Sequence, residues 1–293
     1  MNCNICPRQC NIDRSIKQGF CVSNDTLRVA RAALHMWEEP CISGDSGSGT
    51  VFFSGCNLRC IFCQNNQISR GLIGKDISVE RLSQIFFELK DKGASNINLV
   101  TPTHFLNQIK KAIIIAKDEG LDLPIVYNTS GYENVDSLKK LEGLIDVYLP
   151  DCKYYDDELA IRFSASPNYH KIAMKAIAEM VRQTKKCSFD DKGIIKSGVI
   201  VRHMVLPGHT LDSIRVIDSL YDTFKDDIYI SIMSQYTPVK EIKEYPELNR
   251  RLKKREYQKV TDHALTIGIT NGFIQDGEAA LESFIPAFDC QGV

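Results

Sequence analysis

The sequence predicts an α/β fold, a partial (β/α)6 TIM-like barrel with a small cysteine-rich N-terminal extension. The first observation behind this prediction is that short apolar runs alternate with amphipathic helical patterns from residue 50 onward. The second is that the apolar runs are nearly continuous and rich in β-branched residues, which is typical of parallel strands covered on both faces. The third is their number. About six β–α units fall short of the eight that close a barrel, so we expect an open sheet.

The expected elements follow one another in regular order along the chain. Each strand is predicted from an apolar run, and each helix from apolar residues that recur every three to four positions. Because the chemistry of parallel folds collects at the carboxyl ends of strands, the residues directly after each strand are the first candidates for a site. The expected strands are 50–54, 96–101, 124–128, 144–149, 198–205 and 228–233, and the expected helices are 78–93, 104–119, 135–142, 167–185, 211–224 and 249–266, with a further apolar run at 271–274.

Composition excludes several classes of protein. Of the 293 residues 43% are hydrophobic, which is enough for a sizeable core. The formal net charge is −1, so nothing favours nonspecific binding to nucleic acid or to an anionic membrane. No apolar run reaches the ~18–20 residues that span a bilayer, and the polar N-terminus lacks the apolar region of a signal peptide. We therefore expect a cytoplasmic protein with no nucleic-acid or membrane partner.

The first part of the chain differs in composition from the rest. It combines closely spaced cysteines, a basic amphipathic stretch at 26–40 and a glycine- and serine-rich stretch at 43–49. We interpret residues 1–45 as a small metal-binding or wrapped module, joined by a flexible link to a barrel domain formed by residues 46–293.

The cysteines of this module have the spacing of a metal site. Four cysteines within 19 residues suit a tetrahedral zinc site or a second iron–sulfur cluster, and the spacing does not separate these alternatives. Eleven cysteines in a chain expected in a reducing cytosol favour metal or redox chemistry over disulfides, although isolated thiols are often simply buried. The four candidate ligands are Cys3, Cys6, Cys10 and Cys21.

A second group of three cysteines directly follows the first expected strand. Cys56, Cys60 and Cys63 lie within eight residues, so their thiolates could converge on one centre. Iron–sulfur clusters are usually held by four thiolates, and three would leave one iron open to an exogenous ligand. A closed zinc site that borrows Cys41 and three buried thiols that bind nothing are the alternatives.

The stretch GCNLRCIFCQN resembles the cluster motif of the radical SAM superfamily, in which an aromatic residue precedes the last cysteine, as Phe62 does here. The resemblance implies that Cys56, Cys60 and Cys63 hold a [4Fe–4S] cluster and that S-adenosylmethionine (SAM) chelates the fourth iron. It also implies reductive cleavage of SAM to a 5′-deoxyadenosyl radical, which abstracts hydrogen from a substrate. An electron donor such as flavodoxin or ferredoxin would be a partner.

Over roughly residues 48–275 the chain is most similar to the activating enzymes of glycyl radical enzymes. In that family a Thr-Gly-Gly-Glu sequence after the second strand binds the amino group of SAM. Thr101 matches its first residue, whereas Pro102, Thr103 and His104 replace the others. The Thr103 hydroxyl and backbone carbonyls are then the candidate acceptors for the ammonium. The alternative for His104 is a helix-start residue that packs under the sheet.

Three further strand ends match the same family. After the third strand, Asn128 and Ser130 suit ribose hydroxyls or the substrate carboxylate, unless this segment is only a turn. After the fourth, Lys153 would bind the carboxylate of SAM, and Asp151 could pair with it or help to bind a monovalent cation. After the fifth, Arg202 would hold the SAM carboxylate through its planar fork. Functionless strand-end charges remain the alternative for these residues.

The N-terminal cysteine spacing together with the cluster motif looks most like the PflX-type branch of pyruvate formate-lyase activating enzyme-like proteins. The resemblance implies an oxidoreductase that takes hydrogen from a glycine of a partner glycyl radical enzyme. Modification of a small molecule or of another peptide is a second hypothesis. A third, of a different class, is a non-catalytic iron–sulfur electron carrier or sensor.

Overall fold

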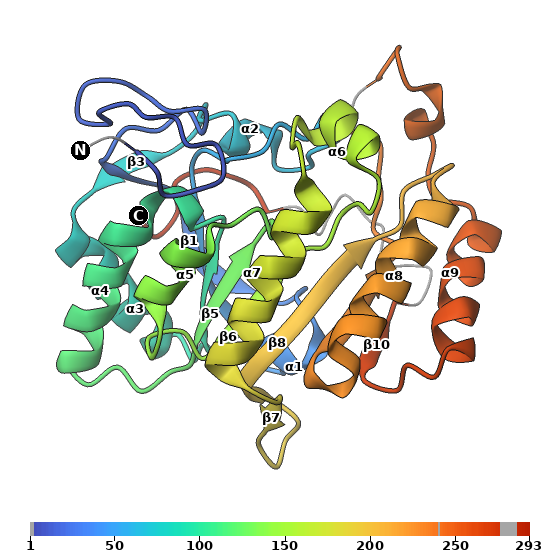
Figure 1. The fold of residues 1–293 in the computed structure, drawn as a ribbon. Helices are drawn as coiled ribbons and strands as arrows, with labels where there is room; N and C mark the ends of the chain where they lie inside the picture. The colour runs from blue at the N-terminus through green and yellow to red at the C-terminus, as the bar shows by residue number, and fades with distance from the viewer. Residues whose placement is uncertain (1–2, 240, 276–285) are drawn as a thin grey trace.

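One open parallel sheet organises the molecule (Figure 1). The computed structural model describes residues 3–239, 241–275 and 286–293. Within them seven strands pair in parallel in the order β10, β9, β8, β6, β5, β4, β2, which confirms the partial barrel. β1 and β3 extend the β2 edge in antiparallel pairs, and β7 pairs with β8. The strands are β1 Leu27–His35, β2 Ser48–Phe53, β3 Lys75–Ile77, β4 Ile97–Val100, β5 Ile125–Thr129, β6 Val147–Pro150, β7 Ser188–Phe189, β8 Ile195–Met204, β9 Tyr229–Met233 and β10 Gly272–Ile274.

The long helices of the described residues cover one face of the sheet (Figure 1), as the right-handed crossovers of parallel strands require. Each has an apolar face; in α3, for example, Leu82, Ile85, Phe86 and Leu89 are buried at helical spacing. All six expected helices are present, and a helix that the sequence did not indicate, α6, lies between β6 and α7. The helices are α1 Pro40–Ser43, α2 Asn66–Ser69, α3 Val79–Asp91, α4 Leu106–Asp118, α5 Val135–Leu138, α6 Asp157–Ser164, α7 Tyr169–Thr184, α8 Thr210–Phe224 and α9 Lys254–Thr266.

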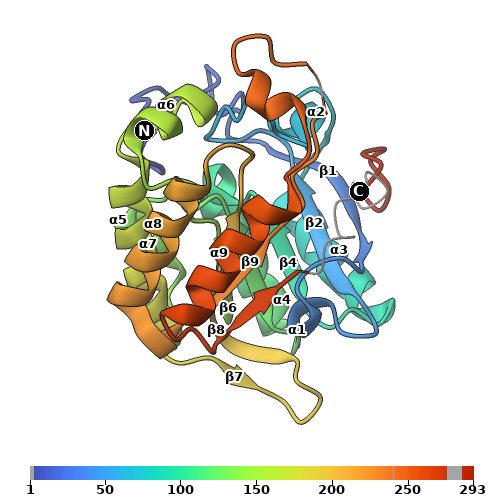
Figure 2. The same ribbon diagram turned by 90° about the vertical axis from the view of Figure 1, so that its right-hand side faces the viewer.

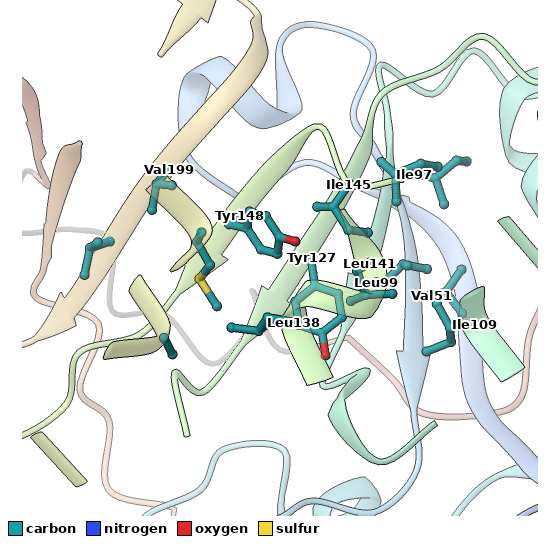
Figure 3. Packing of buried hydrophobic residues seen from close by; sticks show 14 of the residues in the cluster. Val51, Ile97, Leu99, Ile109, Tyr127, Leu138, Leu141, Ile145, Tyr148 and Val199 are labelled. Atoms are coloured by element: carbon teal, nitrogen blue, oxygen red, sulfur yellow. The ribbon is translucent and has the colours of Figure 1, made fainter. Parts of the chain in front are cut away.

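The main core lies between these helices and the sheet. Strand residues such as Val51, Leu99, Tyr127 and Tyr148 pack there, and the side chains in Figure 3 come from both layers. Ile109 of α4 belongs to the same cluster. Burying several such side chains contributes about 1.5–3 kcal/mol each, so this core holds the strand ends in place. No helix of the described ranges has the length and apolar composition to cross a membrane.

The opposite face of the sheet is partly filled by the N-terminal segment. Because side chains alternate along a strand, Val126, Val147 and Ile200 point away from the main core. They pack with Cys41 and Ile42 of α1, which Figure 2 shows on the other side of the sheet from α7 and α8. The segment around α1 therefore forms a plug against the concave side of the open barrel.

The chain enters this plug from β1, which belongs to the same sheet. Register pairs such as His35 with Ser48 join β1 to β2. The stretch expected as a flexible link, 43–49, instead makes a tight turn into β2, and Ser48 and Gly49 are already buried strand residues. Figure 1 shows the loops that precede β1 at the same end of the sheet as α2 and α6.

Candidate cofactor-binding site

The loop that carries three of the cysteines, residues 54–65, leaves the carboxyl end of β2. Its first turn depends on Gly55, which has a φ of +94°. A Cβ at this position would collide with the Ser23 hydroxyl and lie 2.5 Å from the Cys21 carbonyl oxygen. Only glycine accepts both the positive φ and this close approach. The turn delivers Cys56 under the N-terminal segment, where its N–H donates to the Cys21 carbonyl over 3.3 Å.

The three thiols of this loop lie within electrostatic reach of one another. Burial first, and then the neighbouring Cys60 and Cys63, raise the pKa of Cys56 to about 12. Burial and then Cys60 also raise the pKa of Cys63. Thiols in this condition are neutral at pH 7, and metal coordination deprotonates them outright. Among the described residues no three Cys, His, Asp or Glu side chains are grouped for a single metal ion. In a [4Fe–4S] cluster each thiolate binds a different iron.

Next to the loop is a cavity of about 260 Å³. Cys60, Cys63 and Phe62 line it from the loop, and Phe62 packs edge-on against Tyr236 at 5.8 Å between ring centroids. The ends of β5, β6 and β8 line it from the sheet with Asn128, Asp151, Lys153 and Arg202. Residues that are far apart in sequence thus meet at one edge of the sheet, as the strand-end argument expects.

A network of charged hydrogen bonds crosses this cavity wall. Arg202 donates through Nε to Asp151 Oδ1 over 3.1 Å and through Nη2 to Asn128 Oδ1 over 2.6 Å. Its Nη1 donates to Glu38 Oε2 over 3.0 Å. Lys153 donates to the other oxygen of Asp151 over 2.6 Å. The fork of Arg202 is thereby fixed in its plane by three partners from three different elements.

Burial and ion pairing shift the pKa values of the charged groups in this network in opposite directions. Burial would raise the pKa of Asp151, but Lys153 and Arg202 hold it below its usual value. Burial would lower the pKa of Lys153, but Asp151 and then Cys60 raise it. Arg202 behaves in the same way, with its pKa raised by Asp151, Glu38 and Glu39 against burial. All three groups are charged at pH 7. A monovalent cation at Asp151 would have to share a carboxylate that both bases already use.

Three of the expected contact residues lie away from the cavity lining. The Thr103 hydroxyl donates to buried Glu133, which also accepts from Thr129. Ser130 donates to Asn57 Oδ1 over 3.4 Å, and Thr101 adopts a φ of +59° at the end of β4. His104 is buried, its Nε2 lies 2.8 Å from the Ser54 carbonyl oxygen, and burial lowers its pKa to about 3. Among the described residues of β4 and the loop that follows it, only Val100 lines the cavity.

The four N-terminal cysteines lie near one another beside the cluster loop, although no three of them are grouped closely enough to hold a single metal ion. A Cβ on Gly19 would touch the Sγ atoms of Cys21 and Cys10 at 3.5 and 3.6 Å, so these two thiols converge on the same glycine. Their thiols also interact electrostatically: Cys21 and Cys10 contribute to the raised pKa of Cys6, and Cys3 contributes to the raised pKa of Cys21.

Two arginines clamp the N-terminal loops onto the cluster loop. The Arg8 guanidinium lies 3.8 Å and that of Arg59 4.3 Å from the centroid of the Phe20 ring, so the ring is a shared cation–π partner. Arg8 also donates through Nε to the Asn57 carbonyl over 2.7 Å, and Arg59 donates to the Phe20 carbonyl. The two groups of cysteines are therefore held in a fixed relation.

Residues from the N-terminal segment also line the cavity, although none of them was predicted to do so. They are His35 at the end of β1 and Trp37, Glu38 and Glu39 after it. The Glu38 side chain bonds to residues 60 to 164 positions away in the chain, so no local spacing could reveal these contacts. The one available signal was the adjacent pair of acidic residues before a proline in an otherwise basic stretch.

These features coincide with a known family. The sequence profile of the Radical SAM superfamily matches residues 50–220, and the chain belongs to this superfamily. The family implies a [4Fe–4S] cluster and SAM as cofactors, and a reductant as electron source. Cys60 and Cys63, which line the same cavity as the paired bases Lys153 and Arg202, fit both cofactors.

Curated relatives cover most of the chain. Uncharacterized protein MJ0674 of Methanocaldococcus jannaschii is 30% identical over 273 residues, which are 90% of this chain and 74% of that protein. Pyruvate formate-lyase-activating enzyme of Clostridium pasteurianum is 25% identical over 232 residues, 74% of this chain and 86% of that enzyme.

Solved structures share the fold at low identity. Methylornithine synthase (PylB) gives a TM-score of 0.51 at 15% identity, with 81% of this chain and 68% of that one covered. Streptococcus suis SuiB bound to the precursor peptide SuiA gives a TM-score of 0.51 at 14% identity, with 76% of this chain covered. The chain spans about half of SuiB, 47% of its length.

Proposed function

We propose that this radical SAM enzyme binds its cluster through Cys56, Cys60 and Cys63 and uses it for hydrogen abstraction. When bound, the cluster and SAM supply a 5′-deoxyadenosyl radical, which takes a hydrogen atom from the substrate. The observation that carries the proposal is the juxtaposition of Cys60 and Cys63 with Lys153 and Arg202 around one cavity. Three thiolates leave one coordination position free, and the bases beside it suit an amino acid carboxylate.

The residues around the cavity divide the work of holding SAM. Among the bases of the described cavity lining, Lys153 interacts with the cysteines, since its charge lowers the pKa of Cys56 and Cys63. We assign it to the SAM carboxylate, with Arg202 behind it as the group that orients Asp151 and Asn128. Asn128 presents an amide to the ribose or to the substrate, and Phe62 covers the cluster side. Thr101, Thr103 and Ser130 support the adjoining loops.

The experiment is the formation of 5′-deoxyadenosine by the anaerobically reconstituted full chain. With dithionite, or with reduced flavodoxin or ferredoxin as the cytosolic donor, the wild type should cleave SAM, and a Cys56→Ala/Cys60→Ala/Cys63→Ala variant should not. Formation of the product also excludes a purely electron-carrying role. Absence of 5′-deoxyadenosine from a cluster-loaded wild type would overturn the proposal.

The substrate proposed first is a glycine of a partner glycyl radical enzyme. The similarity to a pyruvate formate-lyase-activating enzyme over 74% of the chain supports it. Deuterium transfer into 5′-deoxyadenosine from a glycine-labelled candidate partner is the test. The alternative is another peptide or a small molecule, and the structure of SuiB bound to its precursor peptide, which shares the fold, favours considering a peptide. If no glycyl radical enzyme transfers deuterium into 5′-deoxyadenosine, the first substrate is excluded and the alternative stands.

The N-terminal cysteines form a second metal site in this proposal, with zinc or a second cluster as its occupant. Metal and sulfide analysis of the Cys56→Ala/Cys60→Ala/Cys63→Ala variant separates the two, since its remaining metal must sit elsewhere. Zinc would indicate a closed tetrahedral site, and iron with sulfide a second cluster. A Cys6→Ala/Cys10→Ala variant is the complementary control and should keep the iron of the cluster loop. If the Cys56→Ala/Cys60→Ala/Cys63→Ala variant retains no metal, the proposal of a second metal site is contradicted.

A further inference from the structure

The segment between β1 and α1 places two carboxylates in the cofactor cavity. Glu38 and Glu39, called here the acidic pair, both line it. Glu38 is fully engaged: besides Arg202, its Oε1 accepts from Asn98 Nδ2 over 3.1 Å and from Asn128 Nδ2 over 3.2 Å. These bonds fix the pair at the wall formed by β4, β5 and β8.

Glu39 is bonded less completely, with the Ser231 hydroxyl as a partner of its carboxyl group. The residue is 7% exposed, and its Oε2 is buried without a hydrogen-bond partner among the described residues. A buried carboxylate oxygen without a donor is costly and is rarely left so in a folded protein. The oxygen lies in a residue that lines a cavity, so a ligand in this cavity can supply the missing donor.

The described residues that line the cavity include more carboxylates than bases. The carboxylates are Glu38, Glu39 and Asp151, and the bases of the described lining are Lys153 and Arg202. Asp151 is bonded to both bases and Glu38 to Arg202, whereas Glu39 interacts with Arg202 only through space and forms no ion pair with either base of the described lining. Burial raises the pKa of Glu39 and Arg202 opposes this rise, so a positively charged donor in the cavity would favour the ionised carboxylate more than a neutral donor would.

The acidic pair also lies apart from the carboxylate-binding side of the cavity. Lys153 is the base that interacts with Cys60, whereas Arg202 is the base that faces the acidic pair. The loop after β4 brings no carboxylate to the cavity, because Thr103 and His104 are bonded elsewhere. Within the described residues, the acidic pair and the already paired Asp151 are the carboxylates that can face an ammonium.

We propose that the acidic pair is a subsite for an amine, with Glu39 as the residue that accepts hydrogen bonds from its N–H groups and Glu38 as the residue that positions Glu39. The amine is either the amino group of SAM, which donates through its N–H groups even when its nitrogen binds iron, or a protonated group of the substrate. The subsite deepens the proposed function by giving the N-terminal segment a part in ligand selection.

The first arm of the test concerns SAM. Binding of SAM and of its deaminated analogue, in which a hydroxyl replaces the amine, is measured by calorimetry on the cluster-loaded full chain without reductant. The chain has a single tryptophan, Trp37, which lines the same cavity, so its fluorescence reports binding locally. If the amine is that of SAM, the wild type prefers SAM by about tenfold or more, and Glu39→Gln loses the preference.

The second arm concerns the substrate, with SAM kept saturating. The probes are N-acetyl-lysine amide and its uncharged counterpart N-acetyl-norleucine amide, followed by the same fluorescence. A preference of the wild type for the lysine probe that Glu39→Gln abolishes assigns the subsite to a substrate cation. Glu119→Gln, at an exposed position at the end of α4, is the matched control and should behave like the wild type in both arms.

The outcomes are decisive in each direction. Loss of either preference in Glu39→Gln supports the subsite, and unchanged preferences in both arms overturn it. Glu39→Asp, which keeps the charge, serves as the second variant and should retain part of the preference if Glu39→Gln does not fold. Because binding is measured without reductant, a failure of SAM cleavage would count against the proposed function and not against the subsite.

Discussion

Arg202 of β8 donates a hydrogen bond to Glu38 over 3.0 Å and thereby joins two residues that are 164 positions apart in the chain. The side chains are 15% and 9% exposed, so the pair is largely withdrawn from water. With Asp151 and Lys153 it forms a connected ionic network that spans β6, β8 and the segment after β1. This network ties the cofactor cavity to the N-terminal segment.

Replacement of Arg202 should therefore destabilise the fold. Arg202→Gln leaves Glu38 and Asp151 without their shared base, and breaking a buried pair in this way costs about 3–5 kcal/mol. The free energy of unfolding from urea titration is the measurement. The control is Arg28→Gln, which removes a largely exposed pair with Asp76 and should cost about 1 kcal/mol or less. Equal losses in the two variants would contradict the buried network.

Gly55 offers a test of the turn that presents the cluster loop. Gly55→Ala adds a Cβ that collides with the N-terminal segment at a φ of +94°, so we expect a loss of about 2–4 kcal/mol and incomplete iron loading. Gly93→Ala is a matched control, since Gly93 has a φ of +88° with nothing within 4 Å of the added Cβ. It should show the backbone strain alone, about 1–2 kcal/mol. Identical losses would mean that the contact with Cys21 and Ser23 has no role.

The cluster ligands can be separated from the other thiols by single substitutions. Cys60→Ala should abolish most bound iron of the loop and reduce SAM cleavage by at least about a hundredfold, because a ligand of the metal is lost. Cys187→Ala removes a half-buried thiol that packs beside β8 and should leave both quantities near the wild-type level. Iron content and 5′-deoxyadenosine are the readouts. A Cys60→Ala variant with full iron would remove this residue from the ligand set.

Glu133 should make stability depend on pH. Burial raises the pKa of its carboxyl from 4.5 to about 7, against the hydrogen bonds from Thr103 and Thr129. The folded state therefore holds more protons than the unfolded state between these values. Stability should fall by about 3 kcal/mol as the pH rises from 4.5 to 7 and stay lower above it. Urea titrations at several pH values should show this slope in the wild type and a flatter one in Glu133→Gln.

The sequence predicts most of the barrel because its strands are buried on both faces. Runs such as the one around Val199 are apolar throughout, and all six predicted strands agree with the structure within three residues at each end. The predicted strand 144–149 begins early because Leu144 still belongs to a turn, in which its N–H donates to the Leu141 carbonyl. β1 escapes such prediction, since Arg28 and Arg31 on its open face give it the pattern of an amphipathic stretch.

The same reasoning explains which part of the site the sequence predicts. Three cysteines in eight residues have a spacing that can be recognised locally, and Asn128, Lys153 and Arg202 follow strands whose ends were predictable. The contact of Glu38 with Arg202 depends on how the chain passes behind the sheet, which no periodicity encodes. Thr103 follows β4 as predicted, but its hydroxyl donates a hydrogen bond to Glu133 in the next loop and does not line the cavity.

The pairing of β1 with β2 has a consequence for anyone who would exchange parts between relatives. The cysteine-rich beginning of the chain cannot be grafted or swapped as an independent cassette, because removing residues up to 45 also removes a strand, the plug and a wall of the cavity. A chimera should exchange residues 3–53 as one undivided segment. The contact residues Asn98, Asn128 and Arg202 should come from the same parent.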